Sequence, residues 1–214
     1  MTSEHWPLHD LRVRTPRVEL RPPDEPTMFA LVELASKGIH DPAFMPFLHP
    51  WTREPDGIRQ RHSLQHYWRA WAEFRPESWH LSMAVRVDGE LVGAQDLFAT
   101  DFPVTREFDT GSWLGLAHQG QGIGQEMRDA AIHLGFAGLG ARRASTGAFF
   151  DNGPSIGVTI ALGYEPNGDG LRIRDGAATR EVRFKLERTA WESRPRHDIT
   201  IDGLEPCLAM FGLA

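Results

Sequence analysis

The sequence predicts a mixed α/β (α+β) fold, in which helices flank a twisted and mostly antiparallel sheet. Three observations support this prediction. Alternating residues surround the turn Asp88-Gly89, as in a hairpin; a glycine-rich segment at 119–124 separates a strand from an amphipathic helix; and a second alternating pair surrounds Asp175-Gly176. We expect a single domain over residues 1–214, because this length suits one sizeable core and is short for two.

The first third of the chain is expected to be largely helical. Residues 17–21 alternate as a half-buried strand does, and helices are expected over 28–36 and 58–74. Between these helices, residues 44–57 hold three prolines and several aromatic residues, which is typical of a structured loop.

The middle of the chain is expected to supply most of the sheet. We expect strands at 80–87, 90–97, 107–116, 143–149, 164–174 and 179–186, with helices at 122–139 and 152–162. The apolar stretches of the tail are expected to pack back on the domain. The chain is therefore divided into a helical portion, a core and a C-terminal extension, over residues 1–75, 76–188 and 189–214.

Composition excludes several classes of protein. The net charge of −6 argues against a nucleic-acid-binding protein. No apolar run reaches the ~20 residues that span a bilayer, and the N-terminal residues do not resemble a signal peptide. The only cysteine, Cys207, cannot form an intrachain disulfide. These features indicate a cytoplasmic protein that associates with neither nucleic acid nor membrane.

The segment Gln119-Gly120-Gln121-Gly122-Ile123-Gly124 has the chemistry of an anion site. Backbone N–H groups at a helix N-terminus point outward, the helix dipole adds partial positive charge, and glycines let the backbone approach a phosphate. The side chain of Gln119 can donate one further hydrogen bond. Taken alone, the segment is also compatible with a turn that binds nothing.

Two common phosphate-binding motifs do not fit this segment. A dinucleotide fingerprint requires G-x-G-x-x-G, but Gln125 occupies the position of its last glycine, which disfavours a dinucleotide-dependent oxidoreductase. A P-loop requires Gly-Lys-Ser/Thr, which is missing.

Several further motifs occur in order on either side of this segment. They are Gly111-Ser112-Trp113-Leu114, Phe136-x-x-Leu139-Gly140-Ala141, Asp151-Asn152-x-x-Ser155 and Leu162-Gly163-Tyr164. Together with Gln119, Gly122 and Gly124, which fill the pattern [Gln/Arg]-x-x-Gly-x-[Gly/Ala] of motif A, they resemble the GNAT superfamily of N-acetyltransferases, in particular its RimJ/RimL-like branch. The resemblance extends over residues 80–188.

This resemblance implies an acetyl-CoA-dependent N-acetyltransferase with splayed central strands. It implies that backbone groups of Leu114 and Leu116 bind the pantetheine arm, assisted by Asn152. The pyrophosphate would lie on Gln119, Gly120, Gln121, Gly122, Ile123 and Gly124. Amine attack on the thioester is direct, so no cysteine nucleophile is required.

The resemblance leaves the proton transfers open. Many family members use a tyrosine as the acid at the position of Thr159, whereas the RimJ/RimL-like branch uses the serine equivalent to Ser155. A hydroxyl that caps the short helix is an equally good interpretation of Ser155. For the base, Asp96 and Asp109 are candidates because both lie on strands beside the expected cleft, and a water chain is an alternative.

Other polar residues near this cleft are expected to have structural roles. Glu126 is expected to face solvent and His118 to be a surface histidine. The ten histidines show no metal-binding spacing, so no metal is predicted. The acceptor is expected to be a small-molecule amine or a protein N-terminus, and a homodimer is plausible. The alternative function is a CoA-binding regulatory or interaction module that has lost catalysis.

Overall fold

The computed structural model of the protein describes residues 4–195 and 198–213. Within these ranges, nine strands form one sheet in the order β7-β8-β6-β5-β4-β3-β2-β1-β9. The strands are β1 (Arg12–Arg14), β2 (Val18–Arg21), β3 (Ser78–Val87), β4 (Glu90–Thr100), β5 (Glu107–Leu114), β6 (Arg143–Phe149), β7 (Glu165–Arg174), β8 (Ala177–Glu187) and β9 (Thr200–Asp202). The α-helices are α1 (Glu25–Ser36), α2 (Ile58–Ala72), α3 (Phe102–Thr105), α4 (Ile123–His133), α5 (Gly153–Ala161) and α6 (Arg188–Ser193). The predicted mixed and mostly antiparallel fold is confirmed.

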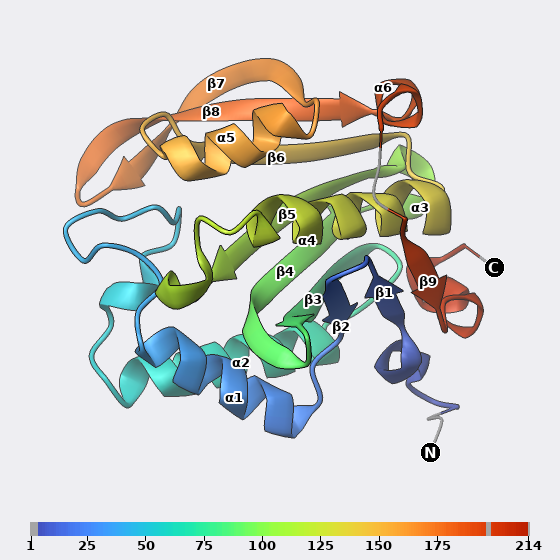
Figure 1. The fold of residues 1–214 in the computed structure, drawn as a ribbon, viewed down its shortest axis with the longest axis horizontal. Helices are drawn as coiled ribbons and strands as arrows, with labels where there is room; N and C mark the ends of the chain where they lie inside the picture. The colour runs from blue at the N-terminus through green and yellow to red at the C-terminus, as the bar shows by residue number, and fades with distance from the viewer. Residues whose placement is uncertain (1–3, 196–197, 214) are drawn as a thin grey trace.

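Helices cover both faces of the sheet. Helices α1 and α2 pack on β3 and β4 around the buried side chains Met28, Leu31, Val32, Tyr67, Ala84 and Ala94. Met83 and Val85 flank Ala84 on β3, so they face the opposite side, where α4 packs against the main core. In Figure 1, α1 and α2 lie at the bottom of the view, and β6, β7 and β8 with α5 lie at the top. Strand β5 lies between these two ends.

Strands β5 and β6 form the sheet's parallel pair, and they pair over only three positions. Glu107, Phe108 and Asp109 of β5 pair with residues 143–145 of β6. Beyond this point β5 remains paired with β4, and β6 remains paired with β8 over residues 143–149. The two strands therefore separate and leave a wedge-shaped gap in the middle of the sheet, which confirms the predicted splay.

Helix α4 packs directly behind strand β5. It begins at Ile123 after the glycine-rich segment and continues as a π-helical turn over residues 134–138, so the expected helix over 122–139 is broken near its end. A Cβ at Gly135 would lie 2.2 Å from Cζ of Phe108. A glycine is therefore required where the buried ring of Phe108 crosses the helix.

The N-terminal and C-terminal portions contribute strands that were not predicted. Residues 12–14 form β1, which pairs with β2 and with β9. The portion 1–75 is therefore less helical than expected. The C-terminal extension, apart from residues 196–197 and 214, which lie outside the described ranges, packs back as expected, with Cys207 and Phe211 buried. None of the helices in the described ranges is long and apolar enough to cross a lipid bilayer.

The expectation that Glu126 faces solvent is wrong. Its side chain is buried on α4, and its carboxylate accepts hydrogen bonds from the Thr15 hydroxyl and from Arg17, whose Nε lies 2.8 Å away. Burial raises the pKa of Glu126, but these hydrogen bonds and the charge of Arg17 outweigh it and lower the pKa. The carboxylate thus connects the β1–β2 turn to α4, and α4 forms one wall of the cleft described below.

We predict that Glu126→Gln destabilises the protein by ~1–2 kcal/mol at pH 7. The pKa of Glu126 is lowered on folding. Its contribution to the free energy of unfolding is therefore present above its ordinary pKa near 4.5, and is lost as the pH falls through the pKa of the folded state. Urea unfolding at pH 7 and at pH 4 measures this effect. The difference in the free energy of unfolding between wild type and variant should be smaller at pH 4. Glu33→Gln on the exposed face of α1 is the control, and an equal effect of both substitutions would contradict the prediction.

Candidate active site

A cleft of about 1300 Å³ occupies the gap between β5 and β6. Its walls are the end of β5, the first turns of α4 and α5, the inner edge of β6 and the loop that follows α1. At the closed end of the gap, the Thr146 hydroxyl donates to the Thr110 carbonyl, 3.3 Å away. A side chain thus replaces the backbone pairing where the strands begin to separate.

Backbone groups of β5 face this cleft. The Gly115 N–H bonds to the carbonyl of Val92 on β4, which fixes the alternation of hydrogen bonds along β5. By that alternation, the N–H groups of Leu114 and Ser112 point away from β4 and into the gap. The Leu116 N–H instead donates to the Gly38 carbonyl. The structure therefore brings Leu114 and Ser112 to the cleft as free donors, and Leu116 does not offer its N–H.

The glycine-rich segment has the backbone geometry of an anion site at the start of α4. Gly120 and Gly122 have φ of +73° and +78°, a conformation that favours glycine. In the described part of the chain, the five consecutive N–H groups from Gly120 to Gly124 have no hydrogen-bond acceptor. A row of free donors at a helix N-terminus is the geometry that binds a phosphate.

The polar side chains of this segment have structural roles. The Gln119 amide donates to the carbonyls of Ile39 (2.7 Å) and Leu114 (2.9 Å), so both of its N–H groups are used within the protein. The Gln121 amide donates to the Ala117 carbonyl, and the Ile123 side chain is buried in the core. The amide of Gln119, which was expected to donate a hydrogen bond to the anion, therefore donates to backbone carbonyls instead.

Asn152 and Ser155 lie on the opposite wall, at the start of α5. The Asn152 Oδ1 accepts from the Ser155 N–H (3.3 Å), so Asn152 is the residue that caps this helix. The Ser155 hydroxyl is half-buried, lines the cleft and has no hydrogen-bond partner among the described residues. Of the two interpretations of Ser155, the geometry therefore favours a hydroxyl available to a ligand.

Asp109 lies in the cleft, at the last paired position of β5 and β6. In the described ranges its carboxylate has neither an ion-pair nor a hydrogen-bond partner. Burial raises the pKa of Asp109, and the negative charges of Glu107 and Glu181 raise it further. An unpaired carboxylate with a raised pKa has the properties of a general base.

Asp96 lies on the neighbouring strand, but it is already engaged. Its carboxylate accepts from the Ser82 hydroxyl at 2.6 Å and forms an ion pair with His80 at 3.5 Å. The cleft lining does not include Asp96. Of the two candidate bases, the structure brings only Asp109 to the cleft.

His66, His80 and Asp96 form a group that sequence spacing could not reveal. Their possible ligand atoms all lie within 4.8 Å of one another, which is compatible with a bound metal ion. The three residues come from α2, β3 and β4, so no short motif connects them. Because His80 and Asp96 already neutralise each other, the group also forms a complete ion pair without a metal.

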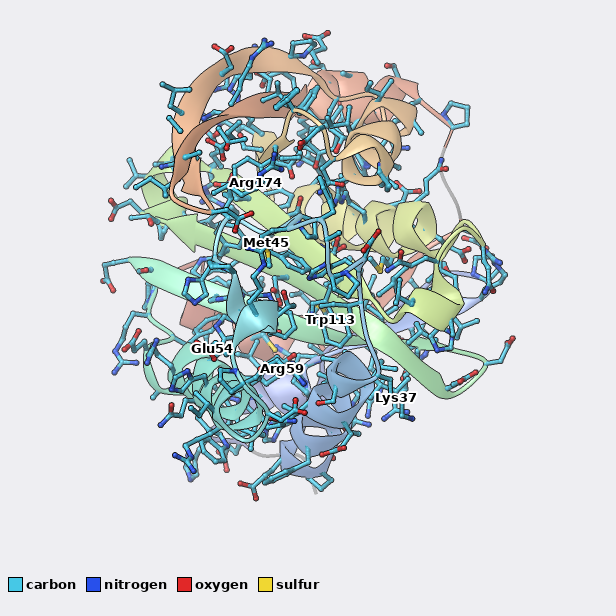
Figure 2. The ribbon with its side chains drawn as sticks, turned by 90° about the vertical axis from the view of Figure 1, so that its left-hand side faces the viewer. Lys37, Met45, Glu54, Arg59, Trp113 and Arg174 are labelled. Carbon is cyan, nitrogen blue, oxygen red and sulfur yellow. The ribbon has the colours of Figure 1, made fainter. Side chains whose placement is uncertain are left out.

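An aromatic loop covers the other side of the cleft. Trp51 lies 6.2 Å from Trp113 of β5 and 5.6 Å from Phe47, measured between ring centroids. Arg174 of the β7–β8 hairpin stacks on Phe44, at 5.5 Å. Figure 2 faces this loop, with Met45 drawn between Trp113 and Arg174. The loop therefore crosses the gap from one half of the sheet to the other.

The cleft passes through the sheet. Side chains alternate along β5, so Asp109 and Trp113 face the aromatic loop, whereas Ser112 and Leu114 face α4 and α5. Two reactants can therefore enter from opposite faces and meet at the centre of the sheet. Arg128 of α4 also lines the α4–α5 side; sequence reasoning missed it, since an arginine within a helix carries no special signal.

This fold and cleft place the chain in the acetyltransferase class. Residues 17–165 match the description "Acetyltransferase (GNAT) domain". The chain belongs to the GNAT acetyltransferase family and is a GNAT-type N-acetyltransferase, which confirms the resemblance drawn from the motifs.

Solved structures share the fold. RimJ of Mycobacterium smegmatis, in complex with a CoA disulfide, is 19% identical with a TM-score of 0.72, over 95% of each chain. RimL, a ribosomal alpha-N-protein acetyltransferase solved with coenzyme A, is 19% identical with a TM-score of 0.65, over 81% of this chain and 95% of its own. A chimera of the spermidine N-acetyltransferase SpeG from Vibrio cholerae and hSSAT is 13% identical with a TM-score of 0.66, over 83% of this chain and 99% of its own.

We predict that Asp96→Asn costs ~1–2 kcal/mol of stability near pH 6 and less near pH 9. Burial opposes the charge on each partner, but their attraction outweighs it, so the pKa of His80 is raised and that of Asp96 is lowered. Both groups are charged above the ordinary pKa of Asp96. The stabilisation by this ion pair is lost as the pH rises through the raised pKa of His80.

Chemical unfolding at both pH values measures this effect. Glu54→Gln is the matched control, because it breaks the ion pair between Glu54 and the more exposed His62. A penalty for Asp96→Asn that is as large at pH 9 as at pH 6 would show that the ion pair is not its origin.

Proposed function

We propose that the protein transfers the acetyl group of acetyl-CoA to a primary amine by direct attack of the amine on the thioester. The observation that carries this proposal is the cleft through the sheet, with an anion cradle at one side and an unpaired carboxylate at the other. Membership of the GNAT family supports acetyl transfer, and two of the related structures contain CoA.

The donor would bind along β5 and α4. The N–H groups of Gly120 to Gly124 would hold the pyrophosphate, and those of Leu114 and Ser112 would face the pantetheine arm and the thioester carbonyl. Donors that are fixed before the reaction stabilise the developing oxyanion without reorganisation, which is a large term in acyl transfer. Asn152 keeps its amide nitrogen for the pantetheine while its oxygen caps α5.

Asp109 would act as the base. The acceptor amine is an ammonium ion at neutral pH and must lose a proton before it can attack. Among the described residues Asp109 has no partner, and it lies on the face of β5 that carries Trp113, opposite the face with the groups that would bind CoA. Ser155 would donate a hydrogen bond to the sulfur that leaves.

The acceptor would be a cationic amine next to an apolar group. Asp109 would attract the ammonium, and Trp51, Trp113 and Phe47 present apolar rings to the same cleft. Among the related structures, RimL is described as acting on protein N-termini and SpeG on spermidine. The aromatic wall suits a peptide N-terminus or an aryl-alkyl amine better than a polyamine, which carries several charges.

We predict that the wild type binds acetyl-CoA and releases free thiol when amines are added, and that Gly124→Asp abolishes both. Gly124 has ordinary backbone angles and room for a side chain, with its nearest neighbours at 3.7 and 3.8 Å. An acidic residue in the first turn stabilises a helix, so the variant should fold while its charge repels the pyrophosphate.

Calorimetry with acetyl-CoA and a thiol-release assay test this prediction. Gly124→Asn, which has the same shape without the charge, should lose less affinity. Binding without turnover on peptide N-termini, aryl-alkyl amines and polyamines alike would contradict the proposed enzyme. Unchanged affinity of the folded Gly124→Asp variant would contradict the position of the pyrophosphate.

We predict that Asp109→Asn lowers kcat by ~10²-fold while the affinity for acetyl-CoA stays unchanged. The wild-type rate should fall on the acid side through a pKa above the ordinary value for an aspartate, because the pKa of Asp109 is raised. The variant should lose this limb of the pH profile. Asp169→Asn, in an exposed ion pair with Arg180, is the control, and a variant that kept both its rate and its acid limb would exclude Asp109 as the base.

A further inference from the structure

Arg128 is a buried cation with no counter-ion among the residues that the structure describes. Its residue is 5% exposed, and its guanidinium donates to the Thr159 hydroxyl at 2.9 Å and to the Ser112 hydroxyl at 3.2 Å. In the described ranges it forms no ion pair with a carboxylate, and its Nε has no hydrogen-bond acceptor. Arg128 and Ser112 both line the cleft.

This arrangement is costly unless an anion completes it. An isolated buried charge costs several kcal/mol even after the protein relaxes. The neighbours of Arg128 are neutral hydroxyls, including that of Tyr164. Burial lowers the pKa of Arg128, yet a guanidinium stays protonated in proteins. A permanent positive charge therefore lies at the wall of the cleft, and no carboxylate of the described residues forms an ion pair with it.

The other anion site in the cleft is a separate one. The N–H groups of Gly120 to Gly124 form the phosphate cradle at the N-terminus of α4, whereas Arg128 lies one turn further along the helix. Across the cleft from β5 stands the free hydroxyl of Ser155, and Thr159 follows it one turn later on α5. Arg128 thus serves the inner part of the cleft, beyond the phosphates.

An anion forms in this inner part when a thioester is cleaved. The sulfur leaves with the electron pair of the carbon–sulfur bond, and an unperturbed thiol such as that of cysteine has a pKa of about 8.5. An alcohol is a far weaker acid than a thiol, so Ser155 can donate a hydrogen bond to the sulfur but cannot transfer its proton outright. The Thr159 hydroxyl already donates to the Ser155 carbonyl, at 2.9 Å. The leaving sulfur therefore needs a positive charge.

We propose that Arg128 stabilises the leaving thiolate of CoA, an inference that rests on the proposed acetyl transfer. The amine, after giving one proton to Asp109, attacks the carbonyl carbon and forms the carbon–nitrogen bond. The carbon–sulfur bond then breaks, and the electron pair remains on sulfur as a thiolate beside Arg128. The nitrogen loses its second proton to solvent, and the thiolate takes up a proton from solvent before CoA departs.

The experiment compares CoA with desulfo-CoA, which lacks the sulfur, over pH 6 to 9. The preference for CoA is the ratio of its affinity to that of desulfo-CoA. In the wild type this ratio should rise with pH, because Arg128 stabilises the bound thiolate. Arg128→Met keeps the volume and removes the charge; it should make this preference independent of pH and lower kcat by ~10–10²-fold at similar KM for acetyl-CoA. Arg128→Lys keeps the charge and should retain much of the pH-dependent preference.

The controls separate charge from structure. Arg180→Gln removes an exposed arginine and should change neither quantity. If Arg128→Met does not fold, two other variants still test the proposal. Arg128→Lys keeps the positive charge, and Thr159→Val frees one guanidinium N–H of Arg128 but also keeps the charge. In both variants the preference for CoA over desulfo-CoA should still rise with pH. A wild-type preference that does not depend on pH, or one that folded Arg128→Met retains in full, would overturn it. Failure of the proposed function is distinguishable, because the wild type would then release no thiol from acetyl-CoA.

Discussion

The parallel pairing of β5 with β6 stops after three positions, and the arrangement of the site depends on this limit. Each strand keeps its other neighbour, so the sheet stays continuous while its centre opens. The backbone of β5 is left with donors that no strand satisfies, and a buried N–H group needs a partner. The gap therefore supplies both the space for a ligand and an extended row of groups that can bind it.

The elements around the gap keep it open. Gly122 starts α4 at the level where β5 ends, and the Glu126 carboxylate fixes this helix to the turn after β1. The Thr146 hydroxyl bridges the two strands where they diverge. On the other face, Trp51 and Arg174 hold the aromatic loop across both halves of the sheet. Buried polar contacts thus hold the frame of the cleft, whereas the loop that covers it is held by aromatic and cation–π contacts.

Local patterns in the sequence predicted the core of the fold and the glycine-rich segment that precedes α4. The turn Asp88-Gly89, the alternation around it and the glycines at 119–124 act over a few residues, so one sequence suffices to recognise them. The pairing of β1 with β9 joins positions almost the whole chain apart, and the burial of Glu126 depends on Arg17. Such contacts arise from tertiary packing, which local propensity does not encode. The role that we propose for Arg128 likewise rests on a tertiary feature, the absence of a counter-ion for it in the described part of the chain.

The position of β9 has a consequence for how the chain folds. Strand β1 cannot be covered on its outer edge until residues 200–202 have been synthesised. Contacts of such high sequence separation form late and slowly, because the entropy of closing the intervening loop must first be overcome. During synthesis, β1 is therefore an open edge that can recruit another strand. Strand β9 thus protects β1 from intermolecular pairing, and the native sheet is complete only after residues 200–202 have been synthesised.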